Sequence, residues 1–376
     1  MVKKKLAACL QQAIIKAQQE GSLVTVPLPD VVIEHPQNPE HGDFASGLPL
    51  KLARTAKESP LAIAEKMAKH ISPPAEIDRF FIAPPGFINF TLRDDWLAKQ
   101  IESILAVGES YGDLALGKGK HVQLEFVSVN PTGPLHVGHG RGAILGSTLA
   151  NVLTAAGYQV KKEYYINDAG SQMDTFYHSL YARYRQLLGI PTEMPKDGYL
   201  GDYVIELARE IITEQGGKEK AISKIAEVGL EGKEPVQEIG KIGQDRIMKW
   251  IKSDLELLGV EFDVWFSEKS LYHNKQYHRA MELLQRGSYV TKKDNAVWFE
   301  SSALGEDKDN VLVRSDGSPT YFASDIAYHY NKFLERKFDT VIDIWGADHQ
   351  GHVPRMKAAI KALGKDPEQL KVIICQ

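Results

Sequence analysis

The sequence is poor in cysteine and contains no long apolar run. Its 376 residues include two cysteines, Cys9 and Cys375, which stand at opposite ends of the chain. Two such distant cysteines argue against a disulfide framework and fit a reducing cytosol, so we expect a cytoplasmic protein. No stretch of eighteen apolar residues is present, which argues against a transmembrane helix and predicts no membrane partner.

An excess of charge of one sign is also missing. The chain has 45 Lys and Arg against 49 Asp and Glu, a net charge of −4. This balance gives no support for a stand-alone nucleic-acid binder, and we expect no DNA partner. The lysines at 3–5 resemble the start of a signal peptide, but Gln11, Gln12 and Lys16 interrupt the apolar segment that would follow. The apolar positions instead repeat at helical spacing and predict an amphipathic helix: Leu6, Leu10, Ala13, Ile14 and Ala17.

The composition is that of a globular protein with two or three domains, with 43% hydrophobic and 25% charged residues. Residues 1–110 read as a small α/β domain, and the glycine-rich stretch 108–119 as its boundary. The elements expected in this domain are strands at 31–33, 77–82 and 86–92 and helices at 48–56, 61–70 and 96–106.

The segment Asn-Pro-Thr-Gly-Pro-Leu-His-Val-Gly-His-Gly-Arg-Gly, residues 130–142, carries two histidines and four glycines. It lies between an alternating strand pattern at 121–127 and an apolar helical pattern at 143–156, which Gly157 should end. A strand at 159–166 follows, so the unit is a βαβ half of a nucleotide-binding sheet. A second βαβ piece comprises a strand at 339–345, a helix at 354–363 and a strand at 371–375.

The junction at residues 130–142 favours an anion. Free N–H groups and the dipole of the following helix point toward it, and glycines let a phosphate approach the backbone. His136 and His139 add hydrogen-bond donors. Metal binding is an alternative, because His349 and His352 form a second pair with this spacing, but zinc-binding helices use an i, i+4 pair. Simple helix capping by the two histidines is the other alternative, and it leaves the glycines unexplained.

The same residues resemble a known family. His136-Val-Gly-His139 is similar to the first signature of class I aminoacyl-tRNA synthetases, and the longer string from Glu125 to His136 resembles bacterial-type arginyl-tRNA synthetase. Further matches follow in the order of that family: Asn167–Gly170 with Gln172, Tyr199–Tyr203, Asp263–Ser267, Asp316–Gly317, Thr320–Asp325 and Trp345–His349. The resemblance covers essentially the whole chain.

This resemblance implies an α/β fold: a Rossmann-type class I catalytic domain at 121–376, incomplete, preceded by an N-terminal tRNA-contacting α/β domain at 1–110. A helix-rich insertion is expected at about 173–260 and a β-hairpin insertion at about 288–315, with Lys293-Asp-Asn295 as its turn. The stretch His41–Ala45 resembles part of the N-terminal domain. Alternatively, Phe44 is a core residue and His41 lies in a surface turn.

The resemblance also implies two sets of binding residues. His136 and His139 are implied to be catalytic, because they would stabilise the α-phosphorus of ATP as arginine's carboxylate attacks it. The ATP-binding residues are Asn130, Pro131, Thr132, Gly133, Pro134, Leu135, His136, Val137, Gly138, His139, Gly346 and Asp348. The arginine-binding residues are Glu125, Asn130, Tyr321, Asp325, His349 and Gln350. No metal ligands are implied.

Arginine's guanidinium has five donors and requires carboxylates or carbonyls. Tyr321 and Asp325 are four residues apart and would share a helix face, so Asp325 is the expected guanidinium partner. Its alternative role is to complement a helix dipole. Asp348 follows a strand and suits ribose hydroxyls. Asn167 and Asp168 lie either at the site or in an Asx turn that caps the helix near Gln172.

The implied function is an arginine–tRNA ligase. It would activate L-arginine with ATP and Mg²⁺ and transfer it to tRNA(Arg), and we expect a monomer. The family's second signature, Lys-Met-Ser-Lys, is absent from the sequence. We therefore expect a fragment, truncated before that loop and the anticodon-binding domain, that makes little arginyl-adenylate. Some members carry Lys where Gly133 stands and lack the last lysine of the second signature, so an intact signature is expected in the full-length protein.

Two alternatives remain open. A cysteinyl-type synthetase would need a zinc-binding cysteine in its pocket, which Cys9 and Cys375 support poorly. A non-enzymatic, truncated paralogue that binds RNA or a protein partner is also possible, although the retained site residues argue against it.

Overall fold

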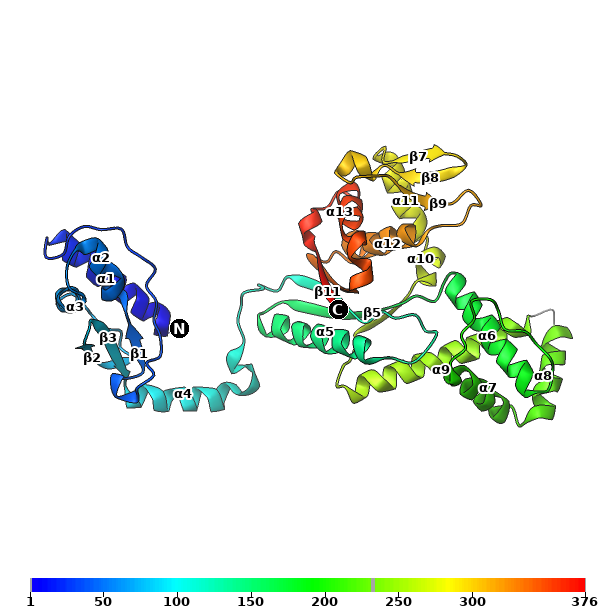
Figure 1. Ribbon diagram of the computed structural model, residues 1–376, viewed down its shortest axis with the longest axis horizontal. Coiled ribbons are helices and arrows are strands. Elements are labelled where there is room, and N and C mark those ends of the chain that lie inside the picture. The colour runs from blue at the N-terminus through cyan, green and yellow to red at the C-terminus, as the bar shows by residue number, and fades with distance from the viewer. Residues whose placement is uncertain (1, 231–233, 376) are drawn as a thin grey trace. The chain divides into compact units, whose positions relative to one another are not determined.

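The chain divides into two compact units, residues 1–112 and 113–376. The computed structural model describes residues 2–230 and 234–375 (Figure 1). Each unit is built around its own apolar core. No helix in the described part of the chain combines the length and apolar character needed to cross a membrane.

The N-terminal unit is a three-stranded antiparallel sheet with helices packed on it. The strand order is β1 (Phe44–Ser46), β3 (Phe87–Leu92), β2 (Ile77–Ala83). Four helices belong to this unit: α1 (Val2–Gln19), α2 (Leu48–Ala56), α3 (Pro60–Ala68) and α4 (Asp94–Val107). All five apolar residues predicted to form the stripe of the first helix are buried, which confirms the amphipathic helix.

The strand predicted at residues 31–33 is wrong. That stretch is extended but forms no ladder, and only an isolated bridge joins Glu34 to Ala45 nearby. The strand is formed instead by Phe44–Ser46, within the stretch that resembles the N-terminal domain of the family. Phe44 is buried in the core of this unit, and His41 is exposed at the end of a short 3₁₀ helix. Phe44 and His41 therefore lie where the alternative interpretation placed them, in the core and in a surface turn.

The second unit is built on a five-stranded parallel sheet. The strand order is β11 (Leu370–Cys375), β10 (Thr340–Gly346), β4 (His121–Glu125), β5 (Gln159–Ile166), β6 (Val264–Ser267), and all neighbours are parallel. Helix α5 (Val137–Ala155) joins β4 to β5, and α13 (Val353–Ala362) joins β10 to β11. Both predicted βαβ units are therefore confirmed.

The junction between β4 and α5 differs from the prediction at both ends. The strand ends at Glu125 because Val127 and Ser128 adopt φ values of 70° and 45°, in the left-handed region. The helix begins at Val137 rather than at residue 143, so His136 is its N-cap, and His139 and the last three glycines of the motif belong to its first turns. A Cβ atom at Gly146 would lie 2.2 Å from the Phe126 ring, so this glycine lets α5 pack closely on the strand end.

Two insertions extend this unit. Four mutually contacting helices follow β5: α6 (Ser171–Leu187), α7 (Asp202–Glu214), α8 (Lys218–Leu230) and α9 (Pro235–Leu257). They fall in the predicted insertion at about 173–260, of which residues 231–233 lie outside the described residues. A three-stranded antiparallel sheet comes later: β7 (Val290–Lys293), β8 (Ala296–Phe299) and β9 (Asn310–Val313). Asp294 and Asn295, both at positive φ, form its first turn.

Further helices lie between the strands of the second unit. Between β6 and β7 lie α10 (Lys269–His273) and α11 (Gln276–Arg286). After β9 comes α12 (Tyr321–Tyr330), which continues directly into a π-helical turn, Asn331–Glu335. The helices α12 and α13 contact each other, and Figure 1 shows both beside the sheet.

Candidate active site

A cavity of about 1320 Å³ opens at the carboxyl ends of β4, β5 and β10. In open parallel sheets, this edge is where ligands bind. Its wall includes the segments that follow these three strands and the start of α12. Of the residues predicted to bind ATP or arginine, the following line it: Asn130, Thr132, Gly133, Pro134, His139, Tyr321, Gly346, Asp348 and His349.

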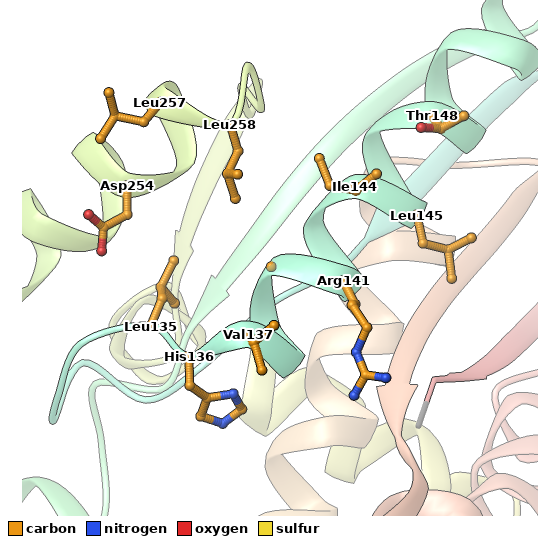
Figure 2. A pocket seen from close by; sticks show the side chains of 11 residues that line it. Leu135, His136, Val137, Arg141, Ile144, Leu145, Thr148, Asp254, Leu257 and Leu258 are labelled. Atoms are coloured by element: carbon orange, nitrogen blue, oxygen red, sulfur yellow. The ribbon is translucent and has the colours of Figure 1, made fainter.

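Other predicted residues lie elsewhere. Leu135, His136 and Val137 line a separate pocket of about 910 Å³, whose other wall is formed by the end of α9 (Figure 2). Figure 2 shows this pocket as largely apolar, with His136 and Arg141 at its edge. The remaining predicted residues line neither cavity: Glu125, Pro131, Gly138, Asp325 and Gln350. Glu125 and Asp325 nevertheless lie close enough to Tyr321 to raise the pKa of its hydroxyl, after the larger effect of burial.

The two histidines of the motif cap α5 and stack on each other. The Gly138 N–H donates to His136 Nδ1 at 3.1 Å, and the His136 N–H donates to His139 Nδ1 at 3.3 Å. Their ring centroids are 3.5 Å apart. Burial, followed by the neighbouring His136, lowers the pKa of His139 to about 4, so this ring is neutral at pH 7. Because each Nδ1 accepts a hydrogen bond, a neutral ring carries its proton on Nε2. Capping and donation to a ligand are therefore compatible roles.

A tyrosine from the helical insertion supports the loop before α5. The Tyr203 hydroxyl donates to the Thr132 carbonyl at 2.7 Å. A Cβ atom at Gly133 would lie 3.2 Å from the same hydroxyl oxygen. A lysine at this position would therefore crowd Tyr203, which gives a local reason for the glycine in this chain.

Amide side chains gather where β4 and β5 end. The Asn130 amide donates to the Gln172 side chain. The Asn167 amide, oriented with its NH₂ toward Glu268, lies 2.7 Å from Glu268 Oε2. Asp168 is not free for a ligand, because its carboxylate accepts bonds from Ser267 Oγ at 2.7 Å and from the Lys269 N–H at 3.1 Å.

The Asx turn proposed for Asn167 and Asp168 is not formed as a cap of α6. That helix begins at Ser171, and its N-cap, Gly170, has no side chain to offer. The Asp168 side chain instead ties the end of β5 to the start of α10.

Two carboxylates beside the cavity, Glu268 and Asp325, form no ion pair with any side chain that the structure describes. Glu268 is 5% exposed, and burial raises the pKa of its carboxyl. Burial, then Glu268 and Glu125, raise the pKa of Asp325 well above its usual range. Within the described residues, no Lys, Arg or His side chain forms an ion pair with either carboxylate, although Lys332 and Arg355 act on Asp325 from a distance. Buried negative charge of this kind favours a cationic ligand.

Glu125 differs from these two carboxylates because it already has a cation. Lys332 Nζ lies 2.6 Å from Glu125 Oε2 and 2.8 Å from Asp343 Oδ1. His329 Nε2 lies 3.0 Å from Asp343 Oδ2, and its Nδ1 lies 2.8 Å from the Asp325 carbonyl oxygen. Lys332 and Glu268 were not predicted from the sequence. One available signal was Asp343, an acidic residue in the middle of an apolar strand.

The turn after β10 presents Asp348 to the solvent. Its side chain is 81% exposed, and its Oδ2 lies 3.5 Å from His349 Nε2. A Cβ atom at Gly346 would lie 2.6 Å from Asp348 Oδ1, so the glycine leaves room for this carboxylate. Nearby, burial, followed by Arg355, lowers the pKa of His352 to about 4. No group of three or more His, Cys, Asp or Glu side chains in the described ranges is arranged to hold a metal ion.

Two family models match this chain. The model of the class I tRNA synthetases (R), catalytic domain, matches residues 100–374, and that of the arginyl tRNA synthetase N-terminal domain matches residues 4–92. The parallel sheet with its strand-end cavity is therefore that of a class I tRNA synthetase catalytic domain.

Similar proteins and solved structures show which family of class I tRNA synthetases the chain resembles. The chain is 51% identical over 375 residues to an arginine–tRNA ligase of Dehalococcoides mccartyi strain CBDB1, covering 100% of this chain and 66% of that protein. It is 48% identical over 371 residues to that of Carboxydothermus hydrogenoformans, covering 99% and 64%. A structure described as an arginyl-tRNA synthetase of Campylobacter jejuni aligns with a TM-score of 0.66 at 34% identity, covering 75% of this chain and 60% of that one.

The arginyl-tRNA synthetase of Thermus thermophilus shares the fold, with a TM-score of 0.60 at 20% identity, covering 100% of this chain and 65% of that one. The chain belongs to the arginyl-tRNA synthetase family. It spans just under two thirds of the length of the curated relatives described above.

Proposed function

We propose that this chain is the amino-acid- and ATP-binding part of an arginine–tRNA ligase. The whole protein would join arginine's carboxylate to the α-phosphate of ATP, release pyrophosphate and transfer the arginyl group from the adenylate to the terminal adenosine of tRNA(Arg). The relatives described above carry the name of this activity. The feature of the site that carries the proposal is a pair of carboxylates, the buried Glu268 and the half-buried Asp325, that form no ion pair with a described side chain.

Arginine satisfies the chemistry of this pair. Its planar guanidinium donates to two carboxylates at once and keeps its charge at any physiological pH. Tyr321 stands one helical turn before Asp325 on α12 and lines the cavity, so its hydroxyl can contact the same ligand. Asn130 lines the cavity at the end of β4, where its amide can contact arginine's polar backbone groups. Gln350 is exposed and outside the cavity wall, which weakens its proposed role.

The start of α5 fits the phosphates of ATP. Backbone N–H groups without intrahelical partners occur in the first turn of a helix, where the dipole favours negative charge. The neutral ring of His139 lines the cavity beside them and offers its Nε2–H, a donor that suits charge developing on the α-phosphate. His136 stacks on this ring and caps the helix, and we assign it the same catalytic role. Asp348 suits the ribose hydroxyls.

Magnesium would enter with the nucleotide. Mg²⁺ is commonly bound through substrate phosphates and one or two carboxylates. The exposed Asp348 carboxylate lines the cavity next to Gly346, and its ion pair with His349 at 3.5 Å leaves it accessible to such a contact.

Residues 1–110 are proposed to contact tRNA, and the protein is proposed to act as a monomer in the cytoplasm. The supporting observation for the tRNA role is the match of residues 4–92 to the family's N-terminal domain.

The experiment is a calorimetric titration of this chain with L-arginine, with L-lysine and L-citrulline as controls. Citrulline has nearly the shape of arginine but no charge, so it separates charge recognition from shape. We expect arginine to bind, citrulline not to bind and lysine to bind much more weakly. Asp325→Asn should weaken arginine binding at least 100-fold, about 3 kcal/mol, because a desolvated charge pair loses one partner. Equal binding of arginine and citrulline by the folded chain would contradict the proposal.

A further inference from the structure

A lysine lies in the protein interior directly behind the proposed arginine site. Lys332 is fully buried, although lysine is among the residues least often found in a protein core. It stands in the π-helical turn Asn331–Glu335 that extends α12. Such turns are rare and are frequent at functional sites. Its side chain has no exposed surface and its ammonium is bonded to two carboxylates, so we assign it no direct contact with the ligand.

The position of Lys332 follows from two carboxylates on neighbouring strands. Glu125 on β4 and Asp343 on β10 are register partners on neighbouring parallel strands. Neighbouring strands lie about 4.8 Å apart, so the two carboxylates would repel each other without a cation. The ammonium of Lys332 bonds to both, and its distance to the ring centre of Tyr328 is 4.1 Å. Burial lowers the pKa of Lys332, but Asp343 and Glu125 outweigh burial and raise it, so the lysine stays charged.

The two carboxylates are held differently. Asp343 is fully buried, and both of its oxygens are engaged, one by Lys332 and one by His329. Glu125 keeps 10% side-chain exposure and bonds to Lys332 through Oε2 alone. Its Oε1 accepts no bond from the described residues and is not among the fully buried polar atoms without a partner. Asp343 therefore anchors the lysine, and the lysine orients Glu125.

We propose that Lys332 is a positioning residue of the arginine site, which bonds to one carboxylate oxygen of Glu125 and leaves the other for the substrate's guanidinium. This inference rests on the proposed function. Lys332 supplies the countercharge of Glu125, so that the uncompensated charge facing the substrate is that of Glu268 and Asp325. Without Lys332, the Glu125 side chain loses its orientation, and Asp343 is left as a buried charge with His329 alone.

The test measures arginine and ATP binding by calorimetry for Lys332→Met, Glu125→Gln and the double variant. Lys332→Met should weaken arginine binding at least tenfold and leave ATP affinity within about twofold. In the Glu125→Gln background, Lys332→Met should cause no further loss, because the lysine acts through that carboxylate. Lys361→Met, which removes an exposed lysine of α13, is the control and should change neither affinity.

Three outcomes are distinguishable. Unchanged arginine affinity in Lys332→Met, or losses that add fully in the double variant, would overturn the role of Lys332. Equal losses of arginine and ATP binding would indicate a merely structural lysine and would also overturn it. Failure of the unaltered chain to prefer arginine over citrulline would instead overturn the proposed function.

If Lys332→Met does not fold, Lys332→Met with Asp343→Asn replaces it, because this pair removes the stranded buried charge. Asp343→Asn alone is its reference. The pair should bind arginine at least tenfold more weakly than that reference, and equal affinity would overturn the role of Lys332.

Discussion

The second unit contains two groups of buried or half-buried carboxylates that differ in one respect. Glu125, at the end of β4, and Asp343, in the middle of β10, share the ammonium of Lys332. Glu268 and Asp325, beside the cavity, have no ion-pair partner among the described residues. Carboxylates that share the lysine thus stabilise the fold, whereas the unpaired carboxylates beside the cavity destabilise it. Charge left uncompensated at a cavity is a property of a binding site, because its ligand supplies the missing partner.

The largest effect should come from removing one member of each group. Asp343→Asn should lower the free energy of unfolding by about 3 kcal/mol at pH 7, because Lys332 loses a partner in the interior. Burial alone would raise the pKa of Asp343, but Lys332 and His329 outweigh it and lower the pKa to about 2. This contribution is therefore present above the ordinary pKa near 4 and is lost only as the pH falls toward 2.

Asp325→Asn should not lower the free energy of unfolding and could raise it. Its native charge is disfavoured by burial and by two neighbouring carboxylates, so the unliganded variant should be as stable as the parent or more stable by up to about 1 kcal/mol. Urea unfolding of both variants at pH 7 makes the comparison. Similar losses in the two would show that the two groups do not differ.

Glu268→Gln should be the next largest effect, and it should affect binding. We expect arginine affinity to fall roughly 30-fold, about 2 kcal/mol, because the guanidinium loses one of two uncompensated carboxylates. ATP affinity should not change. Calorimetry measures both, and Glu261→Gln, at an exposed position before β6, is the matched control. A loss no larger than that of the control would leave Asp325 as the only charged partner.

The pH dependence of arginine binding should separate the two groups further. The pKa values of Glu268 and Asp325 are raised, so their carboxyls release protons only above the ordinary range of about 4 to 4.5. In the proposed site, arginine binds the charged carboxylates, so its affinity should rise from pH 5 to pH 7. The rise should be at most roughly tenfold per pH unit for each carboxyl group that loses its proton. Titrations at several pH values test this. Asp325→Asn should flatten the curve, whereas a pH-independent affinity would mean that both groups are already ionised at pH 5.

The smallest effect is expected at Asp168, a carboxylate held only by neutral donors. Its partners are the Ser267 hydroxyl and the Lys269 N–H. Asp168→Asn should lower the free energy of unfolding by about 1 kcal/mol, the contribution of one hydrogen bond. Arginine affinity should stay within about twofold. A large loss of arginine binding would place Asp168 in the site rather than beside it.

Periodicity in the sequence predicts four of the five strands of the parallel sheet and both βαβ units, but not the edge strand β6. It also does not give the residues at which the elements begin and end. The start of α5 was missed because Gly138, Gly140 and Gly142 are poor helix formers. The contact of Gly146 with Phe126 shows that tertiary packing decides there instead. The end of β4 was missed because Val127, normally a strand former, takes a left-handed conformation.

The sequence predicts candidate site residues that directly follow strands. It does not predict contacts between residues that are distant from each other in the sequence. Asn130 and Asp348 stand at strand ends, and a parallel sheet brings such positions together. The partner of Glu125 is a lysine 207 residues away in sequence. No spacing rule connects the two, and the π-helical turn that directs Lys332 inward leaves no pattern that helical periodicity detects. Glu268 was missed for a similar reason, because it looks like any acidic residue between a strand and a short helix.

The hydrogen bond from Tyr203 to the Thr132 carbonyl has a consequence for attempts to reduce this chain to a minimal module. The four-helix insertion connects β5 to β6, so its excision would require a new linker between these strands, and it would also remove the hydroxyl that supports the loop entering α5. A shortened module should then keep its sheet but hold that loop in several arrangements. The insertion is better regarded as a scaffold for the loop between β4 and α5 than as a dispensable appendage.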